Sequence, residues 1–432
     1  MKRSILPVVV FMMIPVSLAW PVERFPPPDF ETGYRLPLTT TPPARETFYE
    51  YLDTAVLVVA LAAAGWLVFK NRSRRWIFVL MIFSLLYFGF WRKGCLCPIG
   101  SIQNIALSVF DVEYAMPVFG LIFFLLPLVS TLFFARTFCA AVCPLGALQD
   151  VVLLKPVSIP VWLESALRLL AYLYLFAAIL LASTGSAFVI CRYDPFVCFF
   201  RLNGNLNIII IGFCLLVIGL FIGRPYCRFL CPYGIVLRQF ARISKYRVTI
   251  TPDQCVKCRL CEDSCPFGAV RTPSEAFSQR DYTSSKRILA LVLLLFPVII
   301  TAGILAGWVI KGYASKAHPT VRLAERIYLE NTGKLEDTTD ASTAFRAGGM
   351  PETQLYEQAE NIRRRFSVGT PVTGALFAFV VWAKLLGHVV RRKRDDYEAD
   401  RAGCLACGRC FSYCPREHLR LKNTESVVLT AR

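Results

Sequence analysis

One cysteine run that occurs twice constrains this chain more than any other feature. The spacing Cys-x-x-Cys-x-x-Cys-x-x-x-Cys-Pro begins at Cys255 and returns at Cys404. This is the ligand run of bacterial ferredoxins, in which thiolates hold [4Fe–4S] clusters. Apolar stretches at 288–310 and 369–390 separate the two runs. The sequence therefore predicts a ferredoxin-like module that is split by two passages through a membrane.

The eight thiolates of the two runs suffice for two clusters. In two-cluster ferredoxins the fourth cysteine of each run binds the other cluster. Carried over to this chain, the crossed ligand sets are Cys255, Cys258, Cys261 and Cys414 for one cluster, and Cys404, Cys407, Cys410 and Cys265 for the other. In the alternative arrangement each run closes its own cluster. A zinc site is a weaker alternative, because four-cysteine zinc sites usually consist of two separated pairs.

The composition indicates a membrane protein that crosses the bilayer several times. The chain has 432 residues, 55% of them hydrophobic, and a mean hydropathy of +0.50. A helix needs roughly 20 apolar residues to cross the hydrocarbon core. Seven stretches approach or reach this length: 53–69, 76–91, 116–134, 169–190, 206–222, 288–310 and 369–390. We therefore expect an all-α polytopic fold with about seven transmembrane helices.

The first residues resemble a targeting segment. Residues 1–20 begin with Met1-Lys2-Arg3, continue as an apolar stretch and end in small residues, as secretory signals do. An uncleaved membrane anchor is the alternative. In either case the Pro-rich segment 21–52 is expected on the periplasmic side.

Basic residues predict how the chain is oriented. The net charge is +18, but Lys and Arg gather at the ends of apolar stretches rather than in a nucleic-acid-binding pattern. The basic groups at 70–75, 224–287 and 391–394 are expected in the cytoplasm. The segment 311–368 mixes both signs and is expected to be a helical periplasmic segment.

These boundaries imply a bacterial inner-membrane protein in several parts. Residues 53–240 form its membrane core. The halves of the ferredoxin module, 241–287 and 391–432, then share the cytoplasmic face.

Three further Cys-Pro elements lie beside apolar stretches, at 92–100, 136–146 and 224–234. Each has a basic residue followed by two cysteines, and the second cysteine is followed by Pro, an apolar residue and Gly. The second and third elements supply four potential ligands on the cytoplasmic side, which are Cys139, Cys143, Cys227 and Cys231. We interpret them as the ligands of another cluster near the membrane surface. The alternative is that they pack as small apolar residues.

Four other cysteines are expected on the opposite side of the membrane: Cys95, Cys97, Cys191 and Cys198. They could hold an outer cluster, Cys191 and Cys198 could form a disulfide, or none of the four has a covalent role. Cys214 stands alone in an apolar stretch and is interpreted as a packing residue.

Haem and nucleotide cofactors have little support in the sequence. His388 lies near the cytoplasmic end of the last stretch but has no clear partner for haem, and His318 and His418 are expected to be solvated. There is no Cys-x-x-Cys-His, so covalent haem is not indicated. No Walker or dinucleotide-binding motif occurs.

The order of membrane spans, two C-x-x-x-C-P elements and two ferredoxin runs resembles that of the NosR/NapH-type membrane polyferredoxins, over roughly 76–415. The resemblance implies electron transfer between a cytoplasmic carrier or the quinol pool and a periplasmic redox partner. The partner could be a flavoprotein, since the covalent-FMN domain of several relatives is missing here. The basic inner loops would also attract an acidic carrier. The spacing Cys95-Leu96-Cys97 departs from the family pattern, which leaves the role of this element open.

Two other functions fit the same motifs. An assembly factor would use similar clusters to reduce a metal such as copper for a respiratory enzyme. A redox sensor is a weaker alternative. The sequence leaves open whether the protein is an enzyme or an electron-transfer component of a larger system.

Overall fold

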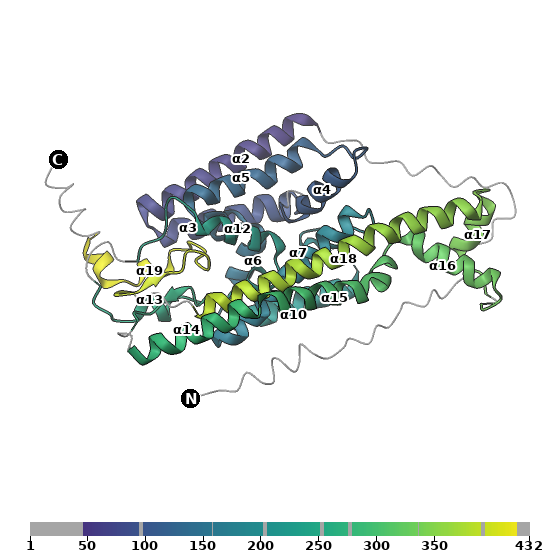
Figure 1. Cartoon of the computed structure of the whole chain (residues 1–432). Coiled ribbons are helices and arrows are strands. Elements are labelled where there is room, and N and C mark those ends of the chain that lie inside the picture. Colours follow the sequence, from purple (N-terminus) through teal and green to yellow (C-terminus); the bar gives the residue numbers. More distant parts are fainter. Residues whose placement is uncertain are drawn as a thin grey trace. The chain divides into compact units, whose positions relative to one another are not determined.

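Helices account for most of the chain that the computed structural model describes (Figure 1). The described residues are 46–94, 98–157, 159–201, 205–250, 255–274, 279–335, 337–389 and 394–420. In chain order the elements are α2 (Thr47–Trp66), η1 (Leu67–Asn71), α3 (Arg74–Ser84), η2 (Leu85–Trp91), α4 (Pro98–Phe110), α5 (Val118–Phe134), η3 (Phe138–Val142), α6 (Pro144–Val152), α7 (Val161–Ser183), α8 (Val189–Tyr193), α9 (Pro195–Arg201), α10 (Leu206–Gly219), α11 (Pro225–Phe229), α12 (Pro232–Arg242), α13 (Leu260–Asp263), β1 (Val270–Arg271), α14 (Gln279–Leu294), α15 (Phe296–Ser315), α16 (Pro319–Asn331), α17 (Asp340–Ala347), α18 (Glu352–Val389), β2 (Glu398–Ala399) and α19 (Arg409–Ser412). The segment 1–20 and most of the Pro-rich segment lie outside the described residues.

Five helical stretches are long and apolar enough to cross a membrane. They are Thr47–Asn71, Arg74–Trp91, Val161–Ser183, Lys286–Ser315 and Glu352–Val389. A sixth is counted if α9 and α10, which are bent by 103° relative to each other, form one broken span. The chain is therefore a membrane protein, but the described residues give five or six spans rather than about seven. One reason is that α5 has only 17 residues.

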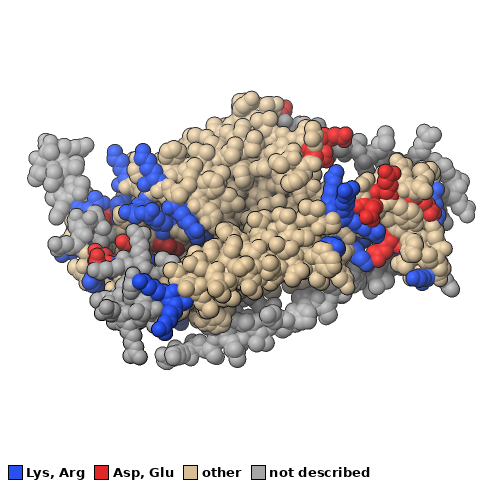
Figure 2. All heavy atoms as spheres, in the orientation of Figure 1, with Lys and Arg blue, Asp and Glu red and all other residues tan. Residues whose placement is uncertain are grey.

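The surface agrees with this assignment. Figure 2 shows a surface without charged side chains between two groups of charged ones. Lys and Arg gather at the end that carries α13 and α19, whereas charges of both signs gather at the end that carries α16 and α17. Such a surface is expected of a protein whose middle lies in lipid.

The Cys-Pro elements mark the starts of short helices inside the apolar core. The helices α6 and α12 begin with Pro144 and Pro232, directly after Cys143 and Cys231. Proline suits the first position of a helix because the N–H that it lacks would have no helical partner there. In each motif the second cysteine thus lies between one short helical element and the next.

The helices α15 and α18 pack closely along their length and lie side by side in Figure 1. A side chain at Gly307 would collide with the backbone of Thr370, and one at Gly374 with the backbone of Gly303. The 38 residues of α18 form one continuous helix. The predicted outer segment 311–368 and the predicted span 369–390 are therefore joined without a break.

The two halves of the ferredoxin module meet in one small sheet. Strand β1 pairs with β2 in antiparallel register, with Val270 opposite Ala399 and Arg271 opposite Glu398. The helices α13 and α19, one from each cysteine run, also contact each other. The split module is thus assembled from segments that lie more than a hundred residues apart.

Candidate iron–sulfur sites and their junction

The two cysteine runs adopt the same loop backbone. Lys257 and Arg259 have positive φ in the first run, and Ala406 and Gly408 have positive φ at the matching positions of the second. This left-handed conformation is strained for residues other than Gly. Its occurrence at the same two positions indicates that both loops are shaped to wrap around a ligand.

One of the crossed cysteine sets is brought together. The members Cys265, Cys404, Cys407 and Cys410 line one small cavity. Backbone N–H groups point at two of their sulfur atoms, since Ala406 donates to Cys404 Sγ at 3.3 Å and Ala269 donates to Cys265 Sγ at 3.4 Å. The geometry favours the crossed arrangement over runs that each close their own cluster.

The other crossed set is less fully gathered. Cys261 is buried against Ile250 and Tyr397, and Cys255 packs against this group. Cys258 is exposed. Cys414 is buried just after α19, which packs against α13. The position of Cys414 is thus compatible with the crossed set, and its ligand role remains a prediction.

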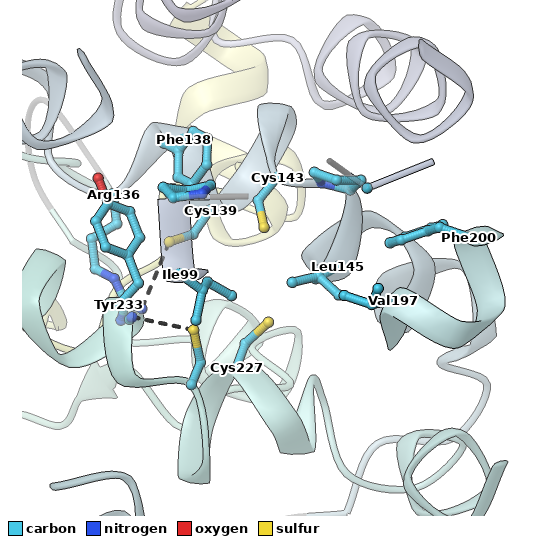
Figure 3. A pocket seen from close by; sticks show the side chains of 15 residues that line it. Ile99, Arg136, Phe138, Cys139, Cys143, Leu145, Val197, Phe200, Cys227 and Tyr233 are labelled. Atoms are coloured by element: carbon cyan, nitrogen blue, oxygen red, sulfur yellow. Dashed lines mark hydrogen bonds between the residues drawn. The ribbon is translucent and has the colours of Figure 1, made fainter. Parts of the chain in front are cut away.

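The four cysteines of the second and third Cys-Pro elements surround one cavity. Cys139, Cys143, Cys227 and Cys231 all line it. Figure 3 shows the sulfur atoms of Cys139, Cys143 and Cys227 turned toward one another. We call this group the membrane cysteine set.

Neighbouring polar groups contact three sulfur atoms of this set. Gln149 donates from Nε2 to Cys227 Sγ at 3.3 Å, and the Gly234 N–H donates to Cys231 Sγ at 3.3 Å. Arg136 lies 3.8 Å from Cys139 Sγ. Hydrogen bonds to the sulfur ligands are one of the means by which proteins tune iron–sulfur potentials.

The glycine that follows Cys-Pro in the second and third elements is at a position where a larger side chain has little room. A Cβ atom at Gly146 would lie 2.8 Å from the Cys139 carbonyl oxygen, and one at Gly234 would lie 3.2 Å from the Cys227 carbonyl oxygen. In both repeats, therefore, the start of the second helix packs directly against the backbone of the first cysteine.

Burial keeps these thiols neutral unless something compensates a thiolate charge. It raises the pKa of Cys227 to about 11 and the pKa of Cys231 well above its ordinary value. In the ferredoxin module, burial raises the pKa of Cys404 to about 12. Metal ligation requires thiolates, so a bound cluster would supply the missing positive charge.

The donor arrangement suits a cluster better than a single ion. Within the described residues, no three His, Cys, Asp or Glu side chains converge on one metal-ion position. Each thiolate of a [4Fe–4S] cluster binds a different iron, so its four ligands surround a volume. Four cysteines around one cavity match this requirement, whereas tetrahedral zinc needs four atoms at about 2.3 Å from one point.

The structure describes two of the four predicted outer cysteines, Cys191 and Cys198. Cys95 and Cys97 lie outside the described residues. Cys191 and Cys198 are free thiols, so they do not form the disulfide. A Cβ atom at Gly100, in the first Cys-Pro element, would lie 3.1 Å from Cys191 Sγ.

This region also borders the membrane cysteine set. The residues Gly94, Pro98 and Val197, which flank three of the four predicted outer cysteines, line the same cavity as that set. The described residues on either side of these cysteines thus lie beside the membrane cysteine set.

A buried carboxylate joins the ferredoxin module to the membrane core. Asp150 lies 2.8 Å from Arg74, 3.5 Å from Arg224 and 3.3 Å from Arg409. Arg409 lies between two cysteines of the second run, and Arg74 also donates to the Cys407 carbonyl at 2.9 Å. We call these four residues the Asp150 junction.

Arg224 extends the junction to the membrane cysteine set. It is fully buried, donates to the backbone carbonyls of Cys139 and Ala140, and lies over the Phe267 ring. Burial alone would lower its pKa, but Asp150 and the thiols of both cysteine groups raise it. A single guanidinium therefore lies within electrostatic reach of both groups.

Sequence reasoning did not identify Asp150, Gln149 or the special role of Arg224. The basic residue before each cysteine pair was visible as part of the repeat, but its burial was not. A carboxylate and an amide three or four residues after Cys-Pro-x-Gly were the available signal, because α6 turns them toward the same core.

Each of the three histidines has a hydrogen-bond partner among the described residues. His388 Nε2 lies 3.1 Å from Ser165 Oγ, and His418 Nε2 lies 2.9 Å from the Ser412 carbonyl. His318 caps α16 by accepting from the Thr320 N–H at Nδ1, and it is half-buried rather than fully solvated. Cys214 is half-buried in α10.

Two family models for 4Fe–4S binding domains match the chain. One matches residues 116–160 and 205–250, and the other matches residues 248–271. The first model covers both halves of the membrane cysteine set, and the second covers the first ferredoxin run. These matches confirm [4Fe–4S] clusters as the cofactor.

Several proteins are similar to parts of the chain. YccM of Escherichia coli, whose name refers to electron transport, is 30% identical over 118 residues, which are 25% of this chain and 33% of YccM. NirI of Paracoccus denitrificans is 31% identical over 121 residues, 27% of this chain and 18% of NirI. An uncharacterized protein of Methanocaldococcus jannaschii is 42% identical over 52 residues, 12% of this chain and 21% of that protein. The chain thus covers a third or less of each of these relatives. No solved structure matches it.

Proposed function

The chain is a 4Fe–4S binding membrane protein that resembles the NosR/NapH-type polyferredoxins, and from this premise we propose that it carries electrons across the membrane. Its terminals would be a cytoplasmic carrier or the quinol pool on one side and a periplasmic redox partner on the other. The names of YccM and NirI agree with a redox role only in general terms. A [4Fe–4S] cluster supplies one-electron transfer when it is bound.

The Asp150 junction is the observation that carries this proposal. Through Arg409 and Arg224 it joins the second ferredoxin run to the backbone of the membrane cysteine set by direct contacts. A protein that used only its ferredoxin module would not need a buried contact of this kind. The junction holds the two groups in a fixed relation, which a short path for electrons requires.

The path would continue toward the outer face through the region of Cys191 and Cys198. Its flanking residues share a cavity with the membrane cysteine set, so no long gap separates the two regions. The chain's own residues would exclude water here, because Phe138, Phe196 and Phe200 are all buried around the cavity or beside it. We propose that Cys95, Cys97, Cys191 and Cys198 hold the outermost cluster.

Electron flow across a sealed membrane tests the proposal. The full-length protein, purified without oxygen, is placed in vesicles that enclose ferricyanide, and dithionite is added outside. We expect ferricyanide reduction to fall at least tenfold in a Cys227→Ser variant that has lost about four irons and keeps the ferredoxin signals. Cys214→Ser is the matched control and should behave as the wild type.

Two results would contradict electron transfer across the membrane. Equal flow in the Cys227→Ser variant and the wild type would show that electrons do not need the membrane cysteine set. A second contradicting result has two parts. The purified protein carries no electrons across the vesicle membrane, and a strain that lacks the protein makes a partner enzyme without its metal. This combination would favour the assembly factor.

A further inference from the structure

A cleft lined by arginine side chains opens beside the ferredoxin module. Its volume is about 480 Å³, which is within the usual range of small-molecule sites. Six arginines line it: Arg238, Arg242, Arg247, Arg271, Arg394 and Arg401. We call it the arginine cleft.

Carboxylates neutralise only part of this charge. Asp396, Glu398 and Asp400 also line the cleft. Among the described residues, only Arg271 of the six arginines has an ion-pair partner, Asp400 at 3.6 Å. Asp400 also accepts a hydrogen bond from the Gly403 N–H. The cleft therefore keeps an excess of positive charge.

The environment of Arg238 disfavours the charge of its side chain. Its side chain extends from α12 into the gap between the membrane core and β2, where it is half-buried. Burial, together with the nearby charge of Arg136, lowers its pKa to about 10, although Asp400 acts in the opposite direction. A desolvated cation among other cations is unfavourable unless an anion occupies the space between them.

The position of the cleft brings it to the membrane boundary. The segment that forms one wall, 247–250, follows Tyr246, whose ring stacks on Phe134 at the end of α5. Arg238 also borders a second, smaller pocket that reaches Cys227. A ligand in the cleft would thus lie beside the ferredoxin module and close to the membrane cysteine set.

We propose that the arginine cleft binds a phosphate group. The planar fork of arginine matches phosphate oxygens with two parallel hydrogen bonds, and several such forks converge here. The phosphate could belong to the headgroup of an anionic phospholipid or to a soluble phosphate compound. An acidic protein docked on the surface would pair the exposed rim and would not reach Arg238.

The test uses full-length protein with its clusters, in two arms. In the first, phospholipid that remains bound after detergent purification is counted by mass spectrometry. In the second, pyrophosphate is titrated into delipidated protein by calorimetry. Arg238→Gln is compared with Arg75→Gln, an exposed arginine on the same predicted face with the same charge change.

Each outcome either supports or contradicts phosphate binding in the arginine cleft. Bound anionic phospholipid that is lost in Arg238→Gln and kept in Arg75→Gln supports a headgroup site. Pyrophosphate binding that weakens about tenfold or more only in Arg238→Gln, with no retained lipid, supports a soluble ligand. If neither probe binds, or if both variants behave alike, the proposal is wrong. If Arg238→Gln loses iron, Arg242→Gln on the exposed rim replaces it in the same comparison.

Discussion

Asp150 is buried, yet it faces three arginines that come from three separate parts of the chain. Burial raises the pKa of its carboxyl group, but the arginine charges outweigh burial and hold the pKa well below its usual range. Desolvating these charges is costly, so a buried ion pair by itself is weak support for stability. The ion pairs instead favour one position of the ferredoxin module on the core, because this docking pairs all four groups of the Asp150 junction.

Replacing Asp150 by Asn should therefore release the module from the core. The three arginines would face a neutral group, and breaking a buried pair costs about 3–5 kcal/mol. We expect the thermal loss of cluster absorbance to begin at a lower temperature and electron flow in vesicles to fall. Asp111→Asn, at an exposed carboxylate, is the control, and an unchanged Asp150→Asn protein would exclude a docking role.

Glu417 gives a contact whose strength depends on pH. It pairs with Arg72 at 2.6 Å and with Arg420 at 2.7 Å. Burial would raise its pKa, but the hydrogen bond from Arg420 and the charge of Arg72 lower it. A lowered pKa in the folded state adds stability above the unfolded value of about 4.3, and this stability is lost as pH falls below it.

The wild type should thus be more stable than Glu417→Gln at pH 7, by roughly 3 kcal/mol, and the difference should shrink as pH falls below about 4.3 and disappear only below the lowered folded-state pKa. Thermal loss of cluster absorbance in both proteins measures this difference. Glu360→Gln, at an exposed side chain, should match the wild type at every pH. A difference that stays constant with pH would show that the charge of Glu417 is not the cause.

At the scale of single residues, the cysteines could be predicted and their charged neighbours could not. Spacing alone predicts Cys265 and Cys404 to be ligands because the run is specific. Nothing in the spacing reveals that Arg224 is fully buried or that Asp150 faces it. Such contacts depend on tertiary packing, which hydrophobic patterns do not encode for polar residues.

At the scale of elements, the apolar stretches were found more reliably than their continuity. The stretch at 288–310 is part of the candidate span Lys286–Ser315, in which α14 and α15 meet at Leu295. The predicted span 169–190 instead begins earlier, in α7 at Val161, and ends at Ser183. Hydropathy cannot locate a bend such as the one between α9 and α10, because both arms are apolar.

The pairing of α15 with α18 is an element-scale feature that can be tested. Gly307→Leu should force the helices apart, since its side chain would collide with the backbone of Thr370. Because these helices connect the two ferredoxin halves, we expect iron to be lost from the module. Gly312→Leu is the matched control, as its Cβ would meet no atom within 4 Å. Equal iron content in both variants would show that the close packing is dispensable.

At the scale of the whole molecule, the chain leaves the ferredoxin module and returns to it through α15 and α18. Strands β1 and β2 then close the module across that excursion. The charge pattern predicted that both halves share one face, and the contacts of Arg72 and Arg74 with the module agree with this. Which side of the membrane that face occupies remains a prediction.

Cleavage at the far end of the excursion tests both the assembly and the orientation. A protease site inserted after Gly349 lies between α17 and α18, in an exposed turn. Protease added to intact spheroplasts should cut there, since this segment is predicted to be periplasmic. The fragments should stay together and keep the ferredoxin absorbance, because α15 remains packed on α18 and β1 on β2.

The same site inserted after Arg420 serves as the control and should be cut only in inverted vesicles. Cleavage of the two sites in the opposite pattern would reverse the orientation. Fragments that separate after cleavage would show that the covalent connection, rather than helix packing and strand pairing, holds the module together. The expected result would mean that the membrane helices act as the scaffold on which a ferredoxin is assembled from two distant parts of one chain.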